Sequence, residues 1–324
     1  MPEIDNPHPG DPTLHVDPEL LPALELLPDM SSLSKDTLAD WRAMLDAPRE
    51  EVADGQNFTV EHVSIPGLGP TDPPIGALLY RPRNKPGKTA ALLNLHGGGY
   101  VLGTAERDHA NCAKLAEDLN CVVLSINYRR APEHPYPAPL EDCYAALAWL
   151  HQNSNRLGVA PDRIGVRGWS AGGGLAAALA LLERDRGQYP IRCLSLVYPM
   201  LDDRTSAGPV SGRFIWTEQA NRFAWNSYLA GEVTPDEMAY AVPARAESLA
   251  GLPPTFIAVG SIDLFVAESV SFAKSLIDAG VSTELHVYPG AFHGFDLLAQ
   301  SRLAQSFSRD QITALKSNLL HRSA

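Results

Sequence analysis

Short apolar segments recur along the chain from about residue 57 onward, and most are separated by longer runs with helical spacing. The first two segments alternate like half-buried strands, and several later ones are nearly continuously apolar, as in strands covered on both faces. The expected strands are 57–65, 75–80, 90–95, 121–126, 163–167, 192–198, 255–260 and 282–288. The expected helices among them are 107–119, 139–155, 175–182, 264–279 and 298–320. This alternation predicts an α/β protein with a mostly parallel eight-stranded sheet and an antiparallel edge.

Two segments interrupt this alternation. Between residues 18 and 46, leucines recur at roughly helical spacing and predict two short helices, which fit a brace on the main domain as well as a lid over a site. Residues 203–245 are rich in aromatic side chains and contain no expected strand, but a helix over 217–230. The predicted organisation is a catalytic domain of residues 51–202 and 246–324, an N-terminal helical cap segment of residues 1–50 and a cap insertion of residues 203–245.

A Gly-x-Ser-x-Gly pattern, with Gly168, Ser170 and Gly172, lies between a β-branched run and a run rich in alanine and leucine. This order predicts a strand, a sharp turn with the serine at its apex, and a helix, which is the nucleophile elbow of α/β-hydrolases. In so tight a turn, side chains two residues either side would collide with the neighbouring strand and helix. A glycine-rich turn with an incidental serine has the same pentapeptide, so partners elsewhere in the chain decide between the two interpretations.

Three glycines follow the expected strand at 90–95, in the His-Gly-Gly-Gly sequence at 96–99. Glycines let the main chain approach a ligand closely and direct N–H groups toward it. In an acyl-transfer enzyme, the N–H groups of Gly98 and Gly99, with that of Ala171 after the serine, would form an oxyanion hole. A flexible loop and a phosphate loop are the alternatives, but no Gly-Lys-Ser/Thr sequence follows to support a phosphate site.

A serine hydroxyl needs a base to remove its proton, and the base needs a carboxylate that orients it. In α/β-hydrolases, the acid and then the histidine follow the serine in the chain, each in a loop after a later strand. Asp263 follows the expected strand at 255–260, and His293 follows the strand at 282–288 with glycines on both sides. We therefore predict a catalytic triad of Ser170, Asp263 and His293.

Other residues compete for the roles of base and acid. The competing bases are His96, His109 and His134, and the competing acids are Glu268 and Asp202. His96 and His134 precede the serine, which is the wrong order for this fold, whereas Asp202 also follows a strand. The predicted acid and base have structural alternatives as well, because an aspartate ahead of a helix is most often an N-cap and a loop histidine can lie at the surface.

Net charge and composition limit the classes of partner and the cellular location that we expect. The 324 residues carry a formal charge of −12, which disfavours nucleic acid and anionic membranes, since both attract basic surfaces. The four cysteines form no C-x-x-C pair, which favours buried thiols in a reducing compartment over disulfides or a zinc site. No run approaches the roughly 20 apolar residues of a membrane helix, and residues 1–10 do not read as a secretory signal. We expect a cytoplasmic protein without a metal.

Taken together, the motifs resemble the bacterial hormone-sensitive lipase-like esterases, family IV of the α/β-hydrolase fold. The resemblance covers about residues 55–320 and is carried by segments 96–99, 128–138, 168–173, 263–268 and 293–295. It implies hydrolysis of carboxylic esters with short to medium acyl chains and no cofactor. It also implies a small-molecule ester as the partner and frequent homodimers formed through the edge strand.

Two positions depart from the family pattern. Trp169 precedes the nucleophile, where the family usually has an acidic or small polar residue, so the hydrogen bonds around the site must differ. The run from Asp263 to Glu268 keeps the acid but is more apolar than is usual in the family. Both changes predict more apolar surroundings for the reacting groups. We expect Trp169, Tyr100 and Phe214 to contact the substrate.

Several functions fit these residues. Ester hydrolysis through an acyl-enzyme is the first prediction. Transfer of the acyl group to an alcohol would use the same triad if Trp169 and the aromatic insertion exclude water. A small-molecule receptor is a third alternative, because plant gibberellin receptors look like this family but lack the catalytic histidine, whereas His293 is present here. An amidase or peptidase would also use the triad, although a cap favours small substrates.

Overall fold

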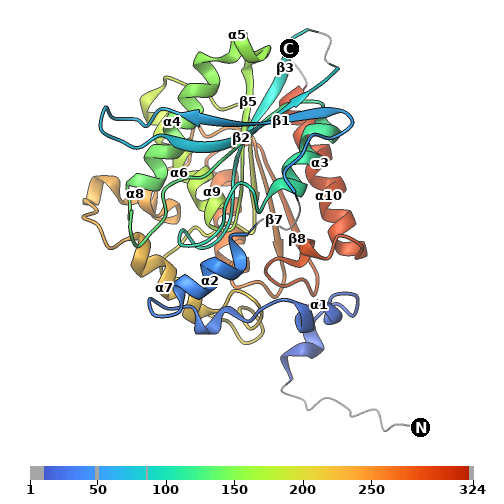
Figure 1. The fold of residues 1–324 in the computed structure, drawn as a ribbon. Coiled ribbons are helices and arrows are strands. Elements are labelled where there is room, and N and C mark those ends of the chain that lie inside the picture. Colours follow the sequence, from blue (N-terminus) through green and yellow to red (C-terminus); the bar gives the residue numbers. More distant parts are fainter. Residues whose placement is uncertain (1–10, 48–50, 85–86, 321–324) are drawn as a thin grey trace.

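The computed structural model describes residues 11–47, 51–84 and 87–320, and an eight-stranded sheet forms its centre (Figure 1). The strand order is β1-β2-β4-β3-β5-β6-β7-β8; β2 is antiparallel to both neighbours and every other pair is parallel. The strands are β1 (Phe58–Ile65), β2 (Ile75–Pro82), β3 (Thr89–Leu95), β4 (Val122–Ile126), β5 (Val159–Trp169), β6 (Leu194–Val197), β7 (Thr255–Gly260) and β8 (Thr283–Tyr288). All eight predicted strands are present, so the α/β-hydrolase fold is confirmed.

Helices cover both faces of the sheet, as predicted. The helices α3 and α10 lie on one face, and α4, α6 and α9 lie on the other (Figure 1). Their bounds are α3 (His109–Leu119), α4 (Ala138–Gln152), α5 (Ser154–Leu157), α6 (Ala171–Arg186), α9 (Val266–Asp278) and α10 (Arg302–Leu315). Shorter turns are η1 (Pro12–His15), η2 (Met30–Ser32), η3 (Pro235–Glu237), η4 (Pro243–Arg245), η5 (Phe295–Leu297) and the π-helical η6 (Lys316–Leu320).

Some helix boundaries differ from the predicted ones for local reasons. The helix expected over 139–155 is divided, because Asn153 separates α4 from α5. The last helix begins at Arg302 instead of 298, because Ser301 caps it by accepting a hydrogen bond from Ala304 N at 3.2 Å. Helix α6 begins directly after Ser170, earlier than the apolar run from which it was predicted.

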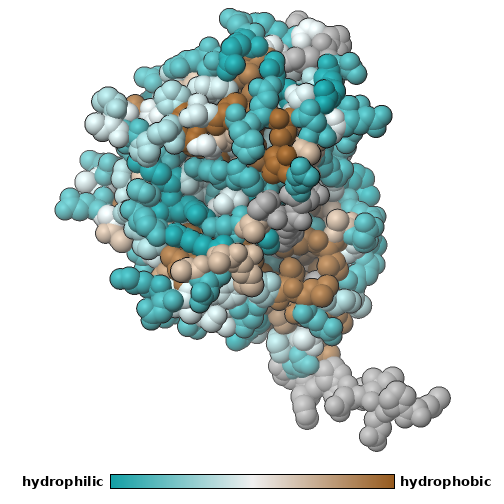
Figure 2. Space-filling view, in the orientation of Figure 1, coloured by the Kyte–Doolittle hydropathy of each residue, from teal (hydrophilic) through white to brown (hydrophobic). Residues whose placement is uncertain are grey.

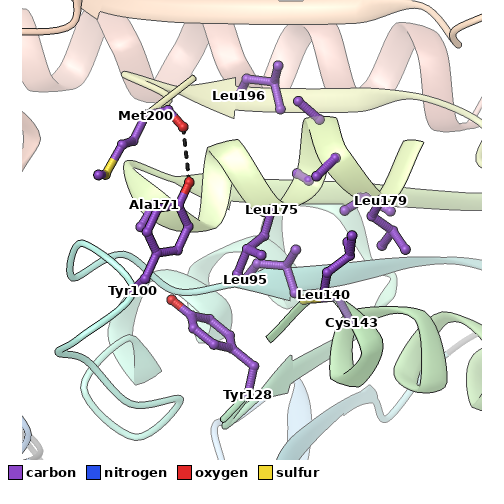
Figure 3. Packing of buried hydrophobic residues seen from close by; sticks show 14 of the residues in the cluster. Leu95, Tyr100, Tyr128, Leu140, Cys143, Ala171, Leu175, Leu179, Leu196 and Met200 are labelled. Carbon is purple, nitrogen blue, oxygen red and sulfur yellow. Dashed lines mark hydrogen bonds between the residues drawn. The ribbon is translucent and has the colours of Figure 1, made fainter. Parts of the chain in front are cut away.

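Apolar packing fixes α6 against the centre of the sheet. Leu175 and Leu179 of α6 lie near Leu95 of β3 and Leu140 of α4, and all four side chains are buried (Figure 3). The strands β3, β4 and β7 are buried along their whole length, as expected of strands covered on both faces. Removing one such leucine side chain costs about 2–5 kcal/mol. The start of α6, and the serine before it, are therefore held by the core.

The N-terminal segment and the insertion lie at the end of the sheet where the parallel strands have their carboxyl ends (Figure 1). They contain α1 (Leu21–Leu26), α2 (Leu38–Leu45), α7 (Glu218–Tyr228) and α8 (Met238–Ala241), of which α8 lies away from this end, beside α6. Thr217 caps α7 by accepting a hydrogen bond from Ala220 N, and Met30 N donates to Ile215 O at 3.1 Å, which joins the two segments. The proposed cap also includes residues 1–10 and 48–50, which lie outside the described residues.

Candidate active site

Ser170 occupies the sharp turn between β5 and α6. Its backbone has φ +50° and ψ −119°, an unusual conformation for a residue with a side chain, and it is held by hydrogen bonds from Ser170 N to Val197 O and from Met200 N to Ser170 O. The glycines on either side are required by close contacts. A Cβ atom at Gly168 would lie 2.0 Å from Gly172 O, and one at Gly172 would lie 2.1 Å from Leu95 O. The predicted elbow geometry is therefore present.

The three predicted triad residues lie together at the carboxyl ends of β5, β7 and β8. His293 Nε2 lies 3.0 Å from Ser170 Oγ, and His293 Nδ1 lies 2.9 Å from Asp263 Oδ2. The serine, histidine and aspartate are 5%, 7% and 1% exposed, so little water competes for these contacts. Asp263 Oδ1 also accepts a hydrogen bond from Phe265 N at 2.9 Å, which fixes the carboxylate. This arrangement can move a proton from the serine hydroxyl to the imidazole.

None of the three competing histidines occupies the position of the base. His96 stacks on Tyr128 with ring centroids 4.1 Å apart, and burial lowers the pKa of His96 to about 4. His109 Nδ1 lies 3.0 Å from Tyr80 Oη, on the α3 side of the sheet. His134 lies exposed in the loop before α4.

The competing acids have other partners. Asp202 forms an ion pair with Arg204 at 2.8 Å, two residues along the chain. Glu268 is buried on α9, where it accepts hydrogen bonds from Leu201 N at 2.7 Å and from the Thr205 hydroxyl. It therefore ties the start of α9 to the segment that follows β6. Burial raises the pKa of Glu268 well above the usual value, and the nearby charges of Asp202 and Asp263 act in the same direction.

We expect Glu268→Gln to raise the melting temperature relative to the unchanged protein more at pH 8 than at pH 5. The pKa of Glu268 is raised in the folded state, so its contribution to stability is full below the unfolded pKa of about 4.5 and is lost as pH rises. Glutamine has no proton to lose, so the difference between the two proteins should grow with pH. Thermal unfolding from pH 5 to 8, with exposed Glu247→Gln as the control, measures this, and a constant difference for Glu268→Gln would contradict it.

The predicted oxyanion donors lie on two turns that face the serine. Gly98 and Gly99 have φ of +118° and +60°, and a Cβ atom on either would come within 2.2 Å of Leu102 O or Trp216 Cη2. Among the described residues, none accepts a hydrogen bond from the Gly98 or Gly99 N–H group. Ala171 begins α6, where N–H groups have no intrahelical acceptor. All three N–H groups are thus without a hydrogen-bond acceptor in the described residues.

The N-terminal segment holds the glycine loop from the outside, a role that the sequence did not reveal. Asp46, after α2, accepts hydrogen bonds from Gly103 N at 2.8 Å and from Arg130 Nη1 at 2.6 Å. Arg42 of α2 donates to Val101 O at 2.9 Å and pairs with Glu133 at 2.7 Å. The only sequence signal was the presence of charges within an otherwise apolar helical segment.

A cavity of about 600 Å³ lies beside the triad. Its walls come from the N-terminal segment, the glycine loop and the insertion. Many of them are apolar, including Leu26, Leu27, Met30, Met44, Leu45, Leu102, Ile215 and Trp216. Leu26, Met44 and Leu297 are also exposed at the surface, and apolar residues gather above α1 in the space-filling view (Figure 2). The site therefore suits a substrate with an apolar part.

Only one of the three predicted substrate contacts lines this cavity. Trp169 does, but Tyr100 and Phe214 do not. Tyr100 is buried in the core, where its hydroxyl donates to Met200 O at 3.2 Å and its ring stacks on Tyr228 (Figure 3).

Phe214 packs against Phe292 instead, with ring centroids 6.1 Å apart. Its neighbours Ile215 and Trp216 line the cavity, so the prediction chose the right segment and the wrong side chain. Side-chain direction in an irregular insertion has no fixed period, unlike that in a helix or strand.

The described residues contain neither a candidate metal site nor a candidate membrane span. No group of three or more histidine, cysteine or carboxylate side chains in this part of the chain is placed to hold a metal ion. No helix within it is both long enough and apolar enough to span a membrane.

Comparison with known proteins identifies the family. The sequence model of a family described as having the α/β hydrolase fold matches residues 92–297. Esterase LipI of Mycobacterium tuberculosis is 34% identical, over 91% of this chain and 92% of its own length. A structure titled bacterial heroin esterase is 35% identical, covers 97% of this chain and all of its own, and has a TM-score of 0.88. Esterase LipW from Mycobacterium marinum is 33% identical, over 94% of this chain and 96% of its own, with a TM-score of 0.77. The chain therefore belongs to the hormone-sensitive lipase-like esterases of the α/β-hydrolase fold.

Proposed function

We propose that the protein hydrolyses carboxylic esters with short to medium acyl chains, through an acyl-enzyme formed on Ser170. The observation that carries this proposal is the 3.0 Å contact between Ser170 Oγ and His293 Nε2. A base at this distance can accept the hydroxyl proton as the oxygen attacks the ester carbonyl. The esterase names of the relatives support the same reaction class.

The proposed cycle has two halves. In the first, Ser170 Oγ bonds to the carbonyl carbon, His293 takes the proton, and the alcohol leaves after His293 returns that proton to it. In the second, His293 deprotonates a water molecule that attacks the acyl-enzyme and frees the acid. Asp263 accepts the Nδ1–H hydrogen bond, which keeps Nε2 available and stabilises the imidazolium.

The negative oxygen of each tetrahedral intermediate would lie among the N–H groups of Gly98, Gly99 and Ala171. Each such donor contributes about 10²–10³ to the rate in enzymes of this kind. The hydrogen bonds from Gly103 N to Asp46 and from Arg42 to Val101 O hold the glycine loop in place. The loop therefore does not have to rearrange as the negative charge forms.

A series of p-nitrophenyl esters from acetate to palmitate tests this proposal. The cavity of about 600 Å³ should admit acyl chains of moderate length, so kcat/KM should peak near four to six carbons and fall for longer chains. The initial rate of p-nitrophenolate release at each length is the measurement. Undetectable hydrolysis at every length would contradict ester hydrolysis, and a maximum at palmitate would contradict the preference for short to medium chains.

The alternative functions are less well supported. Acyl transfer to an alcohol would use the same groups, and the product ratio in mixed water and alcohol distinguishes it from hydrolysis. A receptor without catalytic activity is disfavoured by the hydrogen-bonded serine, histidine and aspartate. A homodimer, a cytoplasmic location and the division into a catalytic domain and a cap remain predictions.

A further inference from the structure

A second cavity, of about 450 Å³, lies between α3 and α10 and borders the first. The two cavities have Asn111, Trp169 and Asp296 in common, so these side chains lie between the triad and the second cavity. Nothing in the catalytic proposal uses this space.

Arg167 lines the second cavity and is an unusual buried cation. It is 1% exposed, and its Nη1 and Nη2 groups donate to Asn94 Oδ1 at 2.8 Å and to Gln311 Oε1 at 3.3 Å. Both acceptors are neutral, and no carboxylate among the described residues forms an ion pair with the guanidinium. The charges of Asp108 and Asp296 act on Arg167 from beyond hydrogen-bond distance, and burial of the guanidinium lowers its pKa despite them. A buried charge without a directly bound counter-charge is costly, so a bound anion would stabilise it.

One N–H group of this cation and one on a neighbouring indole lack hydrogen-bond partners among the described residues. Arg167 Nε and Trp169 Nε1 are buried, and neither has a hydrogen-bond acceptor among the residues that the structure describes. The guanidinium carbon of Arg167 lies 3.9 Å from the centroid of the Trp169 ring, so both donors belong to one small region. Buried donors are nearly always satisfied in native proteins, by protein, water or ligand.

The charges around the second cavity favour an anion. On a chain with a formal charge of −12, its lining has four cations against two carboxylates. The cations are Lys114, Arg167, Arg309 and Lys316, and the carboxylates are Asp118 and Asp296. Lys114 pairs with Asp118 at 2.6 Å and Arg309 with Asp310 at 3.7 Å, which leaves Arg167 and Lys316 without a salt bridge among the described residues. Asp296 Oδ1 accepts a hydrogen bond from the Tyr198 hydroxyl at 2.7 Å, so one of its oxygens is already bound within the protein.

We propose that the second cavity binds a carboxylate group through Arg167, Trp169 and Lys316, next to the site of ester hydrolysis. This inference rests on the proposed function for its position, because the carboxylate can belong to the substrate itself. An ester that carries a second, free carboxylate in its acyl or alcohol part is one source. A separate carboxylate molecule is the other.

Matched pairs of substrates distinguish these sources. Mono-p-nitrophenyl adipate is compared with p-nitrophenyl hexanoate, and 4-acetoxybenzoate with phenyl acetate, each pair differing by one carboxylate. Although the protein is acidic overall, kcat/KM for the anionic member of at least one pair should equal or exceed that of its neutral partner if the substrate supplies the carboxylate. If a free carboxylate is bound instead, millimolar adipate or benzoate should raise the melting temperature without any such preference.

Three variants localise the effect. Lys316→Met should lower the ratio of anionic to neutral kcat/KM by about threefold, and Arg167→Met by about tenfold. The melting shift by free carboxylate should shrink in the same two variants. Lys274→Met, which removes an exposed lysine on α9, should change neither quantity. Arg167→Met removes two buried hydrogen bonds and can fail to fold. In that case, the Lys316→Met variant alone tests the carboxylate site.

Each outcome has one meaning. A preference or melting shift that falls in Lys316→Met but not in Lys274→Met supports the carboxylate site. A preference or melting shift that persists in Lys316→Met, or the absence of both preference and shift in the unchanged protein, overturns it. If the neutral esters are not hydrolysed at all, the proposed function fails, and the melting shift alone then decides the carboxylate site.

Discussion

Replacing Ser170 with alanine is expected to lower kcat for p-nitrophenyl butyrate by about 10⁴-fold or more, with little change in the melting temperature. The substitution removes the oxygen that would form the acyl-enzyme, and His293 then has no hydroxyl to activate. Alanine has no larger side chain than serine, so the strained turn can keep its conformation. Steady-state kinetics, circular dichroism and thermal unfolding of the purified variant measure both effects.

Ser269→Ala is the matched control for Ser170→Ala. Ser269 is also buried, and its hydroxyl has no hydrogen-bond partner among the described residues. Its replacement should leave kcat within about twofold, since it removes no hydrogen bond. A Ser170→Ala protein that folds normally and keeps more than a tenth of the activity would show that another group is the nucleophile.

Replacing Asp263 with asparagine is expected to lower kcat by about 10⁴-fold while preserving the shape of the site. The carboxylate accepts hydrogen bonds on both oxygens, from Phe265 N and from His293 Nδ1. An asparagine whose oxygen still accepts from Phe265 N must turn its NH₂ group toward Nδ1. The imidazole then carries its proton on Nε2 and can no longer accept one from the serine.

Asp202, the alternative acid in the sequence analysis, provides the control for this prediction. Asp202→Asn should leave kcat within about threefold, because Asp202 pairs with Arg204 and does not contact His293. The measurement is kcat of both variants between pH 6 and 9. If Asp202→Asn lost more activity than Asp263→Asn, the assignment of the acid would be wrong.

The residues at the carboxyl ends of the strands could be predicted because local chemistry determines them. Gly168 and Gly172 are required by backbone contacts of about 2 Å, so the pattern around Ser170 has few structural alternatives. Likewise, Asp263 and His293 each follow a buried strand, and the parallel sheet brings such strand ends to one edge. Asp263 and His293 therefore lie close together because of the parallel strand arrangement, which the pattern of apolar segments predicts.

The cap and the supports of the site could not be predicted in the same way. Whether Phe214 or Trp216 faces the cavity depends on how an irregular segment packs, and no periodicity encodes that. The ion pair between Arg42 and Glu133 joins residues 91 positions apart, and many other charge pairs were equally compatible with the sequence. That Arg167 is buried with only neutral hydrogen-bond acceptors depends on how α10 packs against β5, which no local pattern encodes.

Labelling with diethyl p-nitrophenyl phosphate tests the central claim most directly, because this reagent transfers its phosphoryl group to an activated serine hydroxyl. The protein is digested with trypsin after labelling, and the modified peptide is identified by mass spectrometry. We predict one diethylphosphoryl group on Ser170, in the peptide of residues 168–184, with esterase activity lost in proportion to labelling. Labelling of a different residue with Ser170 unmodified, or complete labelling of Ser170 with activity retained, would contradict the account.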